Sequence, residues 1–191
     1  AVLRFTDMAC ALFSNIATVV GASGAALTVD TVYDAQYELI KNRVPGPWFC
    51  VLAPIQFVQF QDSLRAEGGA AAFNAATGAL LGLTSAQGFG KMGVWNGIEF
   101  WTSDSVVTSG VDKHGALFGY GAYGYMEGVP EDVVKFAAPG SYASVAQSGA
   151  PLWVEFERKA AEGHTLVVGN YYVGVSEVED LRAVLIRSSA T

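Results

Sequence analysis

The spacing of apolar residues changes along the chain from a helical period to a strand-like one, and this change restricts the fold class. In residues 2–20 apolar side chains recur every three or four positions, which predicts a helix. From residue 152 onward the sequence contains three runs rich in β-branched and aromatic residues, at 153–160, 164–178 and 183–189. A chain whose helices precede its strands is typical of the α+β class rather than of a doubly wound sheet.

Two further helices and a buried strand are predicted between these ends. The pattern over residues 28–43 predicts a helix capped by Asp30 or Thr31. Its predicted apolar positions are Val32, Ala35, Tyr37, Leu39 and Ile40. Residues 48–53 predict a buried strand, and the next helix begins at Pro54, a residue that suits a first helical turn. The middle of the chain adds glycine-rich, strand-like segments at 93–107 and 114–129.

The sequence contains few charged residues, so electrostatic repulsion between protein molecules is weak. Hydrophobic residues make up 51% of the sequence and charged residues 15%, so we expect apolar surface to be covered by other protein. The formal net charge is -7, and Lys and Arg are scattered singly. The sequence therefore lacks the basic cluster of a nucleic-acid-binding protein. No run is long and apolar enough for a transmembrane helix.

Cysteine and histidine usage argues against a metal or disulfide framework. Cys10 and Cys50 each lie in an apolar pattern, and His114 and His164 are isolated in sequence. The two cysteines are interpreted as buried small hydrophobic residues, because a disulfide scaffold or a zinc site needs more ligands than these. A reducing compartment is the simpler expectation.

Two glycine series match the G-x-G-x-x-G fingerprint of dinucleotide-binding proteins, which needs a strand before the glycines and a helix after them. The series are Gly88, Gly90 and Gly93, and Gly119, Gly121 and Gly124. Neither precedes a predicted helix, so both are interpreted as structural. A Rossmann-type oxidoreductase remains an alternative that bound nicotinamide would support. The sequence contains no phosphate-binding loop and no nucleophile elbow.

Paired carboxylates and aromatic residues are the remaining candidates for chemistry. The pairs are Asp30 with Asp34, Glu155 with Glu157, and Glu177 with Glu179, and the tryptophans are Trp48, Trp95, Trp101 and Trp153. Such carboxylates serve glycoside hydrolysis, and tryptophans stack on sugars. We interpret the carboxylates as solvent-facing and the tryptophans as core or subunit contacts. No residue is therefore assigned as catalytic, cofactor-binding or metal-ligating.

Four segments together resemble the major capsid proteins of tailed phages, which have the Hong Kong 97-type fold. Residues 7–40 resemble the end of the spine helix followed by the first helix of the apical (A) domain. Residues 44–64 resemble the strand, proline and helix found next, and residues 95–128 resemble a strand pair that crosses the A domain. Residues 154–186 resemble the closing β-strands of the peripheral (P) domain.

The resemblance implies a P domain, made of the spine helix and antiparallel strands, and an A domain. It implies the end of the spine helix at residues 1–26, the A domain at 27–150 and the closing P-domain strands at 151–191. The family's N-terminal arm and extended hairpin (E-loop) have no counterpart in the sequence, and the chain opens on Ala1. We therefore expect these residues to be the C-terminal portion of a longer polypeptide.

The function implied by the resemblance is structural. Hexamers and pentamers of the chain would form an icosahedral shell that encloses viral double-stranded DNA without reading its sequence. The implied location is the virion, assembled in the host cytoplasm, with no membrane association, enzymatic activity or cofactor. Scaffolding, portal or decoration proteins are candidate partners. An encapsulin-type compartment of the same fold is the first alternative, and a carbohydrate-binding or glycoside-hydrolysing β-rich module is the second.

The run from Thr165 to Val175 is interpreted as one P-domain strand. It is predicted to pack on the spine helix through residues such as Leu12 and Ile16. Gly174 is expected where this strand passes close to the helix, so that a branched side chain there would overpack.

Overall fold

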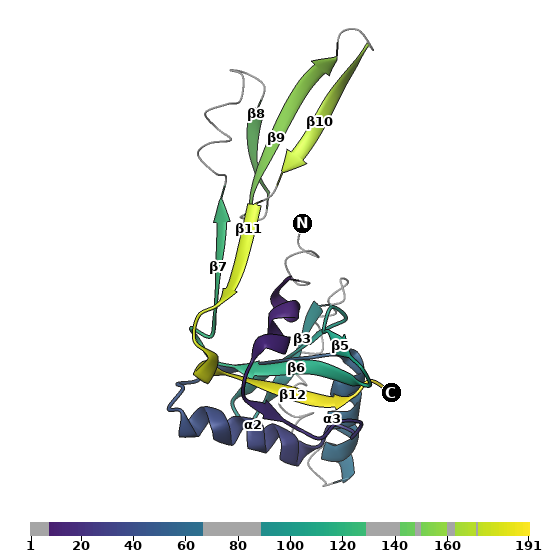
Figure 1. The fold of residues 1–191 in the computed structure, drawn as a ribbon, viewed down its shortest axis with the longest axis vertical. Coiled ribbons are helices and arrows are strands. Elements are labelled where there is room, and N and C mark those ends of the chain that lie inside the picture. Colours follow the sequence, from purple (N-terminus) through teal and green to yellow (C-terminus); the bar gives the residue numbers. More distant parts are fainter. Residues whose placement is uncertain (1–7, 67–88, 129–141, 148–149, 160–162, 171) are drawn as a thin grey trace. The chain divides into compact units, whose positions relative to one another are not determined.

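The computed structural model describes residues 8–66, 89–128, 142–147, 150–159, 163–170 and 172–191 (Figure 1). Contacts divide the chain into two units. The larger unit comprises Val2–Gly124 and Ser176–Thr191, and the smaller unit comprises Tyr125–Val175. The larger unit combines helices with strands, so the chain belongs to the α+β class that the sequence predicted.

A seven-stranded mixed sheet forms the centre of the larger unit. Its order is β1-β12-β6-β2-β4-β3, with β5 paired to β6. The pairs β1–β12 and β2–β4 are parallel, and the other pairs are antiparallel. The strands are β1 (Val19–Val20), β2 (Trp48–Leu52), β3 (Phe89–Trp95), β4 (Ile98–Ser103), β5 (Thr108–Ser109), β6 (Asp112–Phe118) and β12 (Ala183–Ser189).

Two helices, α2 (Val29–Lys41) and α3 (Pro54–Ala66), pack on one face of this sheet. Their buried apolar residues share a core with strand residues such as Phe100 and Leu117. Both helices were predicted from the sequence, α2 from the period of its apolar residues and α3 from Pro54 at its first turn. Burial of one helical face against a sheet is the main source of stability for helices of this length.

The first turn and the exposed side of α2 differ from the prediction. The helix is capped by Thr28, whose Oγ1 accepts a hydrogen bond from the Thr31 N–H at 3.3 Å, so the predicted cap at Asp30 or Thr31 is wrong. Among the predicted apolar positions, Val32, Ala35 and Leu39 are buried. Tyr37 and Ile40 are instead 63% and 55% exposed.

The opposite face of the sheet is covered by the N-terminal segment. Residues 8–11 are α-helical and continue into the 3-10 helix η1 (Leu12–Asn15). Phe13 and Ile16 are buried there with Ala116 and Leu185 of the sheet. Cys10 lies in this cluster and Cys50 lies in the helix-side core, which confirms that both cysteines are buried.

The helix predicted over residues 2–20 ends at Asn15. Ile16 has extended backbone angles, and Val19 and Val20 pair in parallel with Leu185 and Ile186 of β12. Consecutive β-branched residues favour this strand over a helical continuation once a partner strand is present. The prediction for residues 2–7 lies outside the described residues.

Close packing between α3 and the sheet depends on a glycine in β6. A Cβ atom added at Gly115 would lie 2.8 Å from Gln56 Oε1, 2.8 Å from Leu52 Cδ2 and 3.0 Å from the Val51 backbone oxygen. Distances this short require the Gln56 and Leu52 side chains, or the Val51 backbone, to shift. Gly115 therefore leaves room for the Gln56 side chain of α3 against β6.

The smaller unit consists of strands in the part of the chain that is described. A three-stranded antiparallel sheet has the order β10-β9-β8, and a two-stranded sheet pairs β11 with β7. The bounds are β7 (Tyr123–Gly128), β8 (Tyr142–Gln147), β9 (Ala150–Lys159), β10 (His164–Asn170) and β11 (Tyr172–Glu177). The first two residues of β7 and the last two of β11 belong to the larger unit.

Three expectations about the C-terminal strands are wrong. The run Thr165–Val175 is divided between β10 and β11, which lie in different sheets. β12 belongs to the large sheet and not with β9 and β10, so residues 151–191 do not form one group of strands. Ile16 packs against the large sheet. Gly174 has open space where its Cβ would be, so the overpacking expected from a branched side chain there is wrong.

Gly115 and Gly174 form a matched pair for testing this packing. We expect Gly115→Ala to lower the free energy of unfolding by about 1–3 kcal/mol, because the added methyl overpacks against Gln56 and Leu52. Gly174→Ala should change it by less than about 0.5 kcal/mol, because its Cβ position is open. Urea unfolding of both variants measures the difference. Equal effects of the two substitutions would show that the Gly115 contact is not tight.

Candidate functional site

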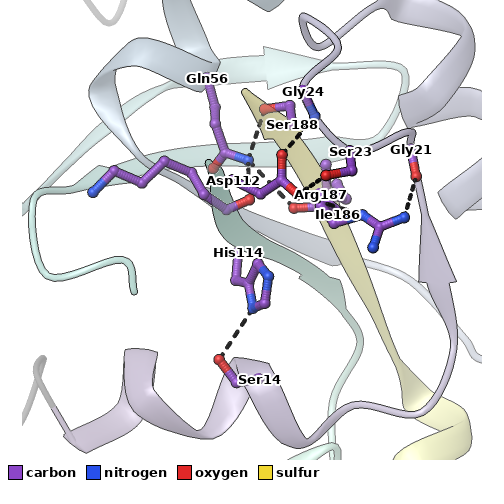
Figure 2. Close-up of polar contacts among 11 residues, drawn as sticks. Ser14, Gly21, Ser23, Gly24, Gln56, Asp112, His114, Ile186, Arg187 and Ser188 are labelled. Atoms are coloured by element: carbon purple, nitrogen blue, oxygen red, sulfur yellow. Dashed lines mark hydrogen bonds and ion pairs between the residues drawn. The ribbon is translucent and has the colours of Figure 1, made fainter. Parts of the chain in front are cut away.

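Polar side chains gather where the N-terminal segment crosses the sheet (Figure 2). Asp112 and His114 lie two positions apart in β6, so their side chains are on the same face of the sheet. In the β6–β12 register, His114 lies opposite Arg187. These three side chains meet residues of the N-terminal segment, and we call the set the β6 polar cluster.

The Asp112 carboxylate holds the loop that follows β1. It accepts hydrogen bonds from the Ser23 hydroxyl at 2.6 Å and from the Gly24 N–H at 2.7 Å, and Arg187 Nε lies 3.9 Å away. The Asp112 side chain is 6% exposed. The hydrogen bonds from Ser23 and Gly24, aided by the charge of Arg187, lower the pKa of Asp112.

Arg187 and Gly21 fix the turn between β1 and this loop. Arg187 Nη2 donates to the Gly21 carbonyl at 3.4 Å. Gly21 has a φ of +89°, and a Cβ there would lie 2.1 Å from the Arg187 carbonyl oxygen. Only glycine fits this backbone position, because it combines left-handed angles with contact to a neighbouring strand.

His114 connects the same face of β6 to η1. Its Nδ1 lies 3.2 Å from the Ser14 hydroxyl oxygen. Partial burial lowers the pKa of His114; the charge of Asp112 opposes this effect and that of Arg187 adds to it. A histidine with a lowered pKa is largely neutral at pH 7, so Nδ1 of His114 can accept a hydrogen bond from the Ser14 hydroxyl.

Serine, histidine and aspartate in one cluster raise the question of a nucleophilic triad. A triad needs the carboxylate to hold the second histidine nitrogen, and donors to stabilise an oxyanion beside the serine. Among the described contacts, the Asp112 carboxylate is engaged by Ser23 and Gly24, and no hydrogen bond joins it to His114. The geometry supports anchoring of the N-terminal segment rather than acyl transfer.

A second polar contact lies on the helix face of the same strands, also shown in Figure 2. Gln56 is 0% exposed. Its Oε1 accepts the Ala53 N–H at 3.0 Å, which satisfies a free donor at the start of α3. Its Nε2 lies within hydrogen-bond distance of the Lys113 carbonyl, the Ile186 carbonyl and the Ser188 hydroxyl, at 3.1, 3.3 and 3.0 Å.

A tyrosine and two carboxylates lie close together near the start of β7 and the end of β11. Tyr123 Oη and Glu177 Oε1 are buried without a hydrogen-bond partner among the described residues. Burial is the main cause of the raised pKa of Tyr123, and the negative charges of Glu177 and Asp180 raise this pKa further. Burial and the neighbouring Asp180 carboxylate raise the pKa of Glu177. Asp180 also accepts the Ala17 N–H at 3.0 Å, so this cluster too holds the N-terminal segment.

The structure does not combine the predicted candidates into a site. Gly90 and Gly93 lie within β3, which a two-residue turn joins to β4, and Gly119 and Gly121 lie between β6 and β7. Neither described part of the glycine series precedes a helix, so the helix that the fingerprint needs is missing there. Gly88 lies outside the described residues.

The tryptophans and carboxylate pairs do not line a sugar site either. Trp48 and Trp95 pack against the helix-side core and Trp101 against the opposite core, which confirms the core interpretation for these three. Glu179 pairs with Arg182, whereas Glu177 is partly buried beside Asp180. Asp30 and Asp34 are both exposed on α2. The side chains of Glu155, Glu157 and Trp153 lie outside the description, and no metal-binding cluster occurs among the described residues.

Replacing Asp112 tests the β6 polar cluster through its pH dependence. Because the folded pKa is lowered, stabilisation by the carboxylate is complete above its ordinary pKa of about 3.9 and is lost as the pH falls through the folded value. We expect Asp112→Asn to be less stable than the wild type at pH 7. The difference should shrink between about pH 5 and pH 2. Urea unfolding across this range measures it, with the exposed Asp104→Asn as control. A difference independent of pH would contradict this assignment.

Comparison by sequence identifies no relative. No protein-family model matches the chain, and none of the curated proteins matches it. No helix among the described residues meets the length and hydropathy needed to cross a membrane.

Comparison by structure gives several matches. A structure from Mycobacterium phage Che8 has a TM-score of 0.60 at 15% identity, over 94% of this chain and 56% of that one. The holo-SrpI encapsulin complex from Synechococcus elongatus PCC 7942 has a TM-score of 0.59 at 15% identity, over 92% and 55%. The capsid of cyanophage P-SCSP1u has a TM-score of 0.55 at 12% identity, over 98% and 62%.

The chain thus spans between 55% and 62% of the length of these three structures. At identities of 12–15% the likeness shows the fold alone. The structural similarity extends over nearly all of this chain, and the matched structures include a phage capsid and an encapsulin. The chain has the Hong Kong 97-type fold that the sequence resemblance implied.

Proposed function

We propose that the chain is the shell-forming part of a major capsid protein, which self-assembles into an icosahedral head enclosing viral double-stranded DNA. The observation that carries this proposal is the shared fold, which covers 92–98% of the chain in each comparison. Fold does not by itself fix function. The proposal therefore also relies on the surface and on the polar clusters of the described residues.

The surface of the larger unit suits assembly. Large apolar side chains that are more than a third exposed include Tyr33, Tyr37, Ile40, Val58, Met92, Val111, Tyr120, Val178 and Leu181. Subunits that associate side by side bury such residues, and aromatic residues are enriched in protein interfaces. The polar clusters, by contrast, connect parts of the same chain. The proposal therefore includes no catalytic turnover.

The proposed domain names follow the two units rather than the boundaries expected from the sequence. The larger unit, with its sheet and helices, would be the A domain, and the strands of the smaller unit would belong to the P domain. The two crossings of the chain between the units then fall at residues 124–125 and 175–176.

An encapsulin-type compartment is the second candidate function. Its supporting observation is the match to the encapsulin complex, whose TM-score of 0.59 is close to the 0.60 of the phage Che8 structure. A phage head and an encapsulin differ in what they enclose. The net charge of -7 is compatible with a shell that encloses DNA without binding it tightly, and it is equally compatible with protein cargo.

Electron microscopy of the intact protein, combined with analysis of the particle contents, tests the proposal. We expect closed, regular shells that contain nuclease-protected double-stranded DNA. Shells that contain a protein cargo and no DNA would replace the phage head with the encapsulin alternative. A protein that stays monomeric at concentrations where shell proteins assemble would contradict both candidates.

A further inference from the structure

Two apolar patches on the larger unit have the properties of a matched pair. The first, the α2 stripe, consists of Tyr33, Tyr37 and Ile40, which are 47%, 63% and 55% exposed. Spacings of four and three residues place the three side chains on one side of the helix. Figure 1 shows α2 as the outer layer of the larger unit, beneath β6 and β12.

The second patch lies around the 3-10 helix η2 (Asp180–Arg182), and we call it the η2 patch. It consists of Tyr120, Val178 and Leu181, which are 60%, 67% and 57% exposed. Hydrogen bonds from the backbone and from a side chain connect the segments that carry these residues. The Val178 N–H donates to the Ala122 carbonyl at 2.8 Å, and Arg182 Nη1 donates to the Tyr120 carbonyl at 3.0 Å.

The two patches lie on different sides of α2. On the side of the α2 stripe, the Tyr33 ring lies 5.1 Å from the Trp95 ring of β3, an edge strand of the sheet. On the other side, Asn42 Nδ2 donates to the Leu181 carbonyl at 3.2 Å. At 100° per residue, Asn42 lies roughly half a turn around the helix from the stripe. One copy of the chain therefore cannot cover one patch with the other.

The charges beside the two patches are opposite. Asp30 and Asp34 are exposed on α2 beside the stripe, and Arg43 is exposed next to Asn42, which holds the η2 patch. Among ion pairs between described residues, none involves these three side chains. Arg182 is already paired with Glu179. The acidic side of the α2 stripe thus matches the cation beside the η2 patch.

We propose that the α2 stripe of one copy binds the η2 patch of a neighbouring copy. This inference rests on the proposed shell function, because that function supplies the second copy. Two different patches on opposite sides of one subunit make a heterologous, head-to-tail contact, which closes into rings when the rotation allows it. Apolar side chains would form the centre of the contact, and Asp30, Asp34 and Arg43 its polar rim.

Cysteine cross-linking between two single variants tests the contact. Tyr37→Cys and Leu181→Cys are made separately, co-expressed so that they assemble together, and oxidised in the intact particle. The native Cys10 and Cys50 are buried, so they do not compete. A disulfide-linked dimer is expected from the mixture and not from either variant alone. Val111→Cys, 64% exposed and outside both patches, replaces Leu181→Cys as the control and should give no dimer.

The possible results separate this contact from the shell function itself. Dimers from Tyr37→Cys alone would show a symmetric contact between two α2 stripes and overturn the head-to-tail arrangement. Regular particles without a cross-link in the mixture would overturn the contact and leave the shell function intact. If the wild-type protein forms no particles, the shell function fails, and the proposed contact fails with it.

Discussion

The buried amide of Gln56 is the contact on which the arrangement of the larger unit depends. It caps the start of α3 at Ala53 and reaches backbone and side-chain acceptors of β6 and β12 with the same group. A buried amide without these partners would cost free energy, so α3 has one favourable position on the sheet. Gly115 provides the space that this position needs.

Two further glutamines connect helices to the sheet in the same way. Gln36 of α2 exchanges hydrogen bonds with Asn96 in the β3–β4 turn, at 2.7 and 3.2 Å. Gln59 of α3 accepts the Leu27 N–H at 3.0 Å and donates to the Ser189 carbonyl at 3.3 Å. On the opposite face the β6 polar cluster holds the N-terminal segment. Both faces of the sheet are thus covered by described segments of the chain itself, and the α2 stripe and the η2 patch are the surfaces that we propose for contact with another copy.

Local sequence patterns predicted elements but not their partners. The helical period located α2, because burial of one face is recorded in the spacing of apolar residues, and Pro54 located the start of α3. The strand-like run at Thr165–Val175 could not reveal its division between two sheets, since strand pairing depends on distant segments. The continuous apolar run Ala183–Ile186, which is fully buried, is typical of a central strand. That signal was present in the sequence, and it identifies β12 as a central rather than a closing strand.

The polar contacts were the part of the candidate site that sequence reasoning missed. His114 is isolated in sequence, yet the fold brings it to Ser14, a hundred positions away, and to Arg187. Such contacts follow from strand register, which no local pattern specifies. Gln36 and Gln56 did leave a signal, because each is a polar residue at a position that the helical period assigns to the buried face. An uncharged polar residue at such a position predicts a specific hydrogen-bond partner.

The free energy of unfolding of Gln56→Leu, compared with that of Gln61→Leu, tests whether the buried amide positions α3. Leucine keeps most of the side-chain volume in both variants. Gln61 lies on the same helix, only partly buried, with no hydrogen bond to another described side chain. We expect Gln56→Leu to lose about 1–3 kcal/mol for each polar group left buried and unpaired, and Gln61→Leu to change the free energy of unfolding by less than about 0.5 kcal/mol. Equal stability of the two variants would contradict the claim that a buried amide positions α3 on the sheet.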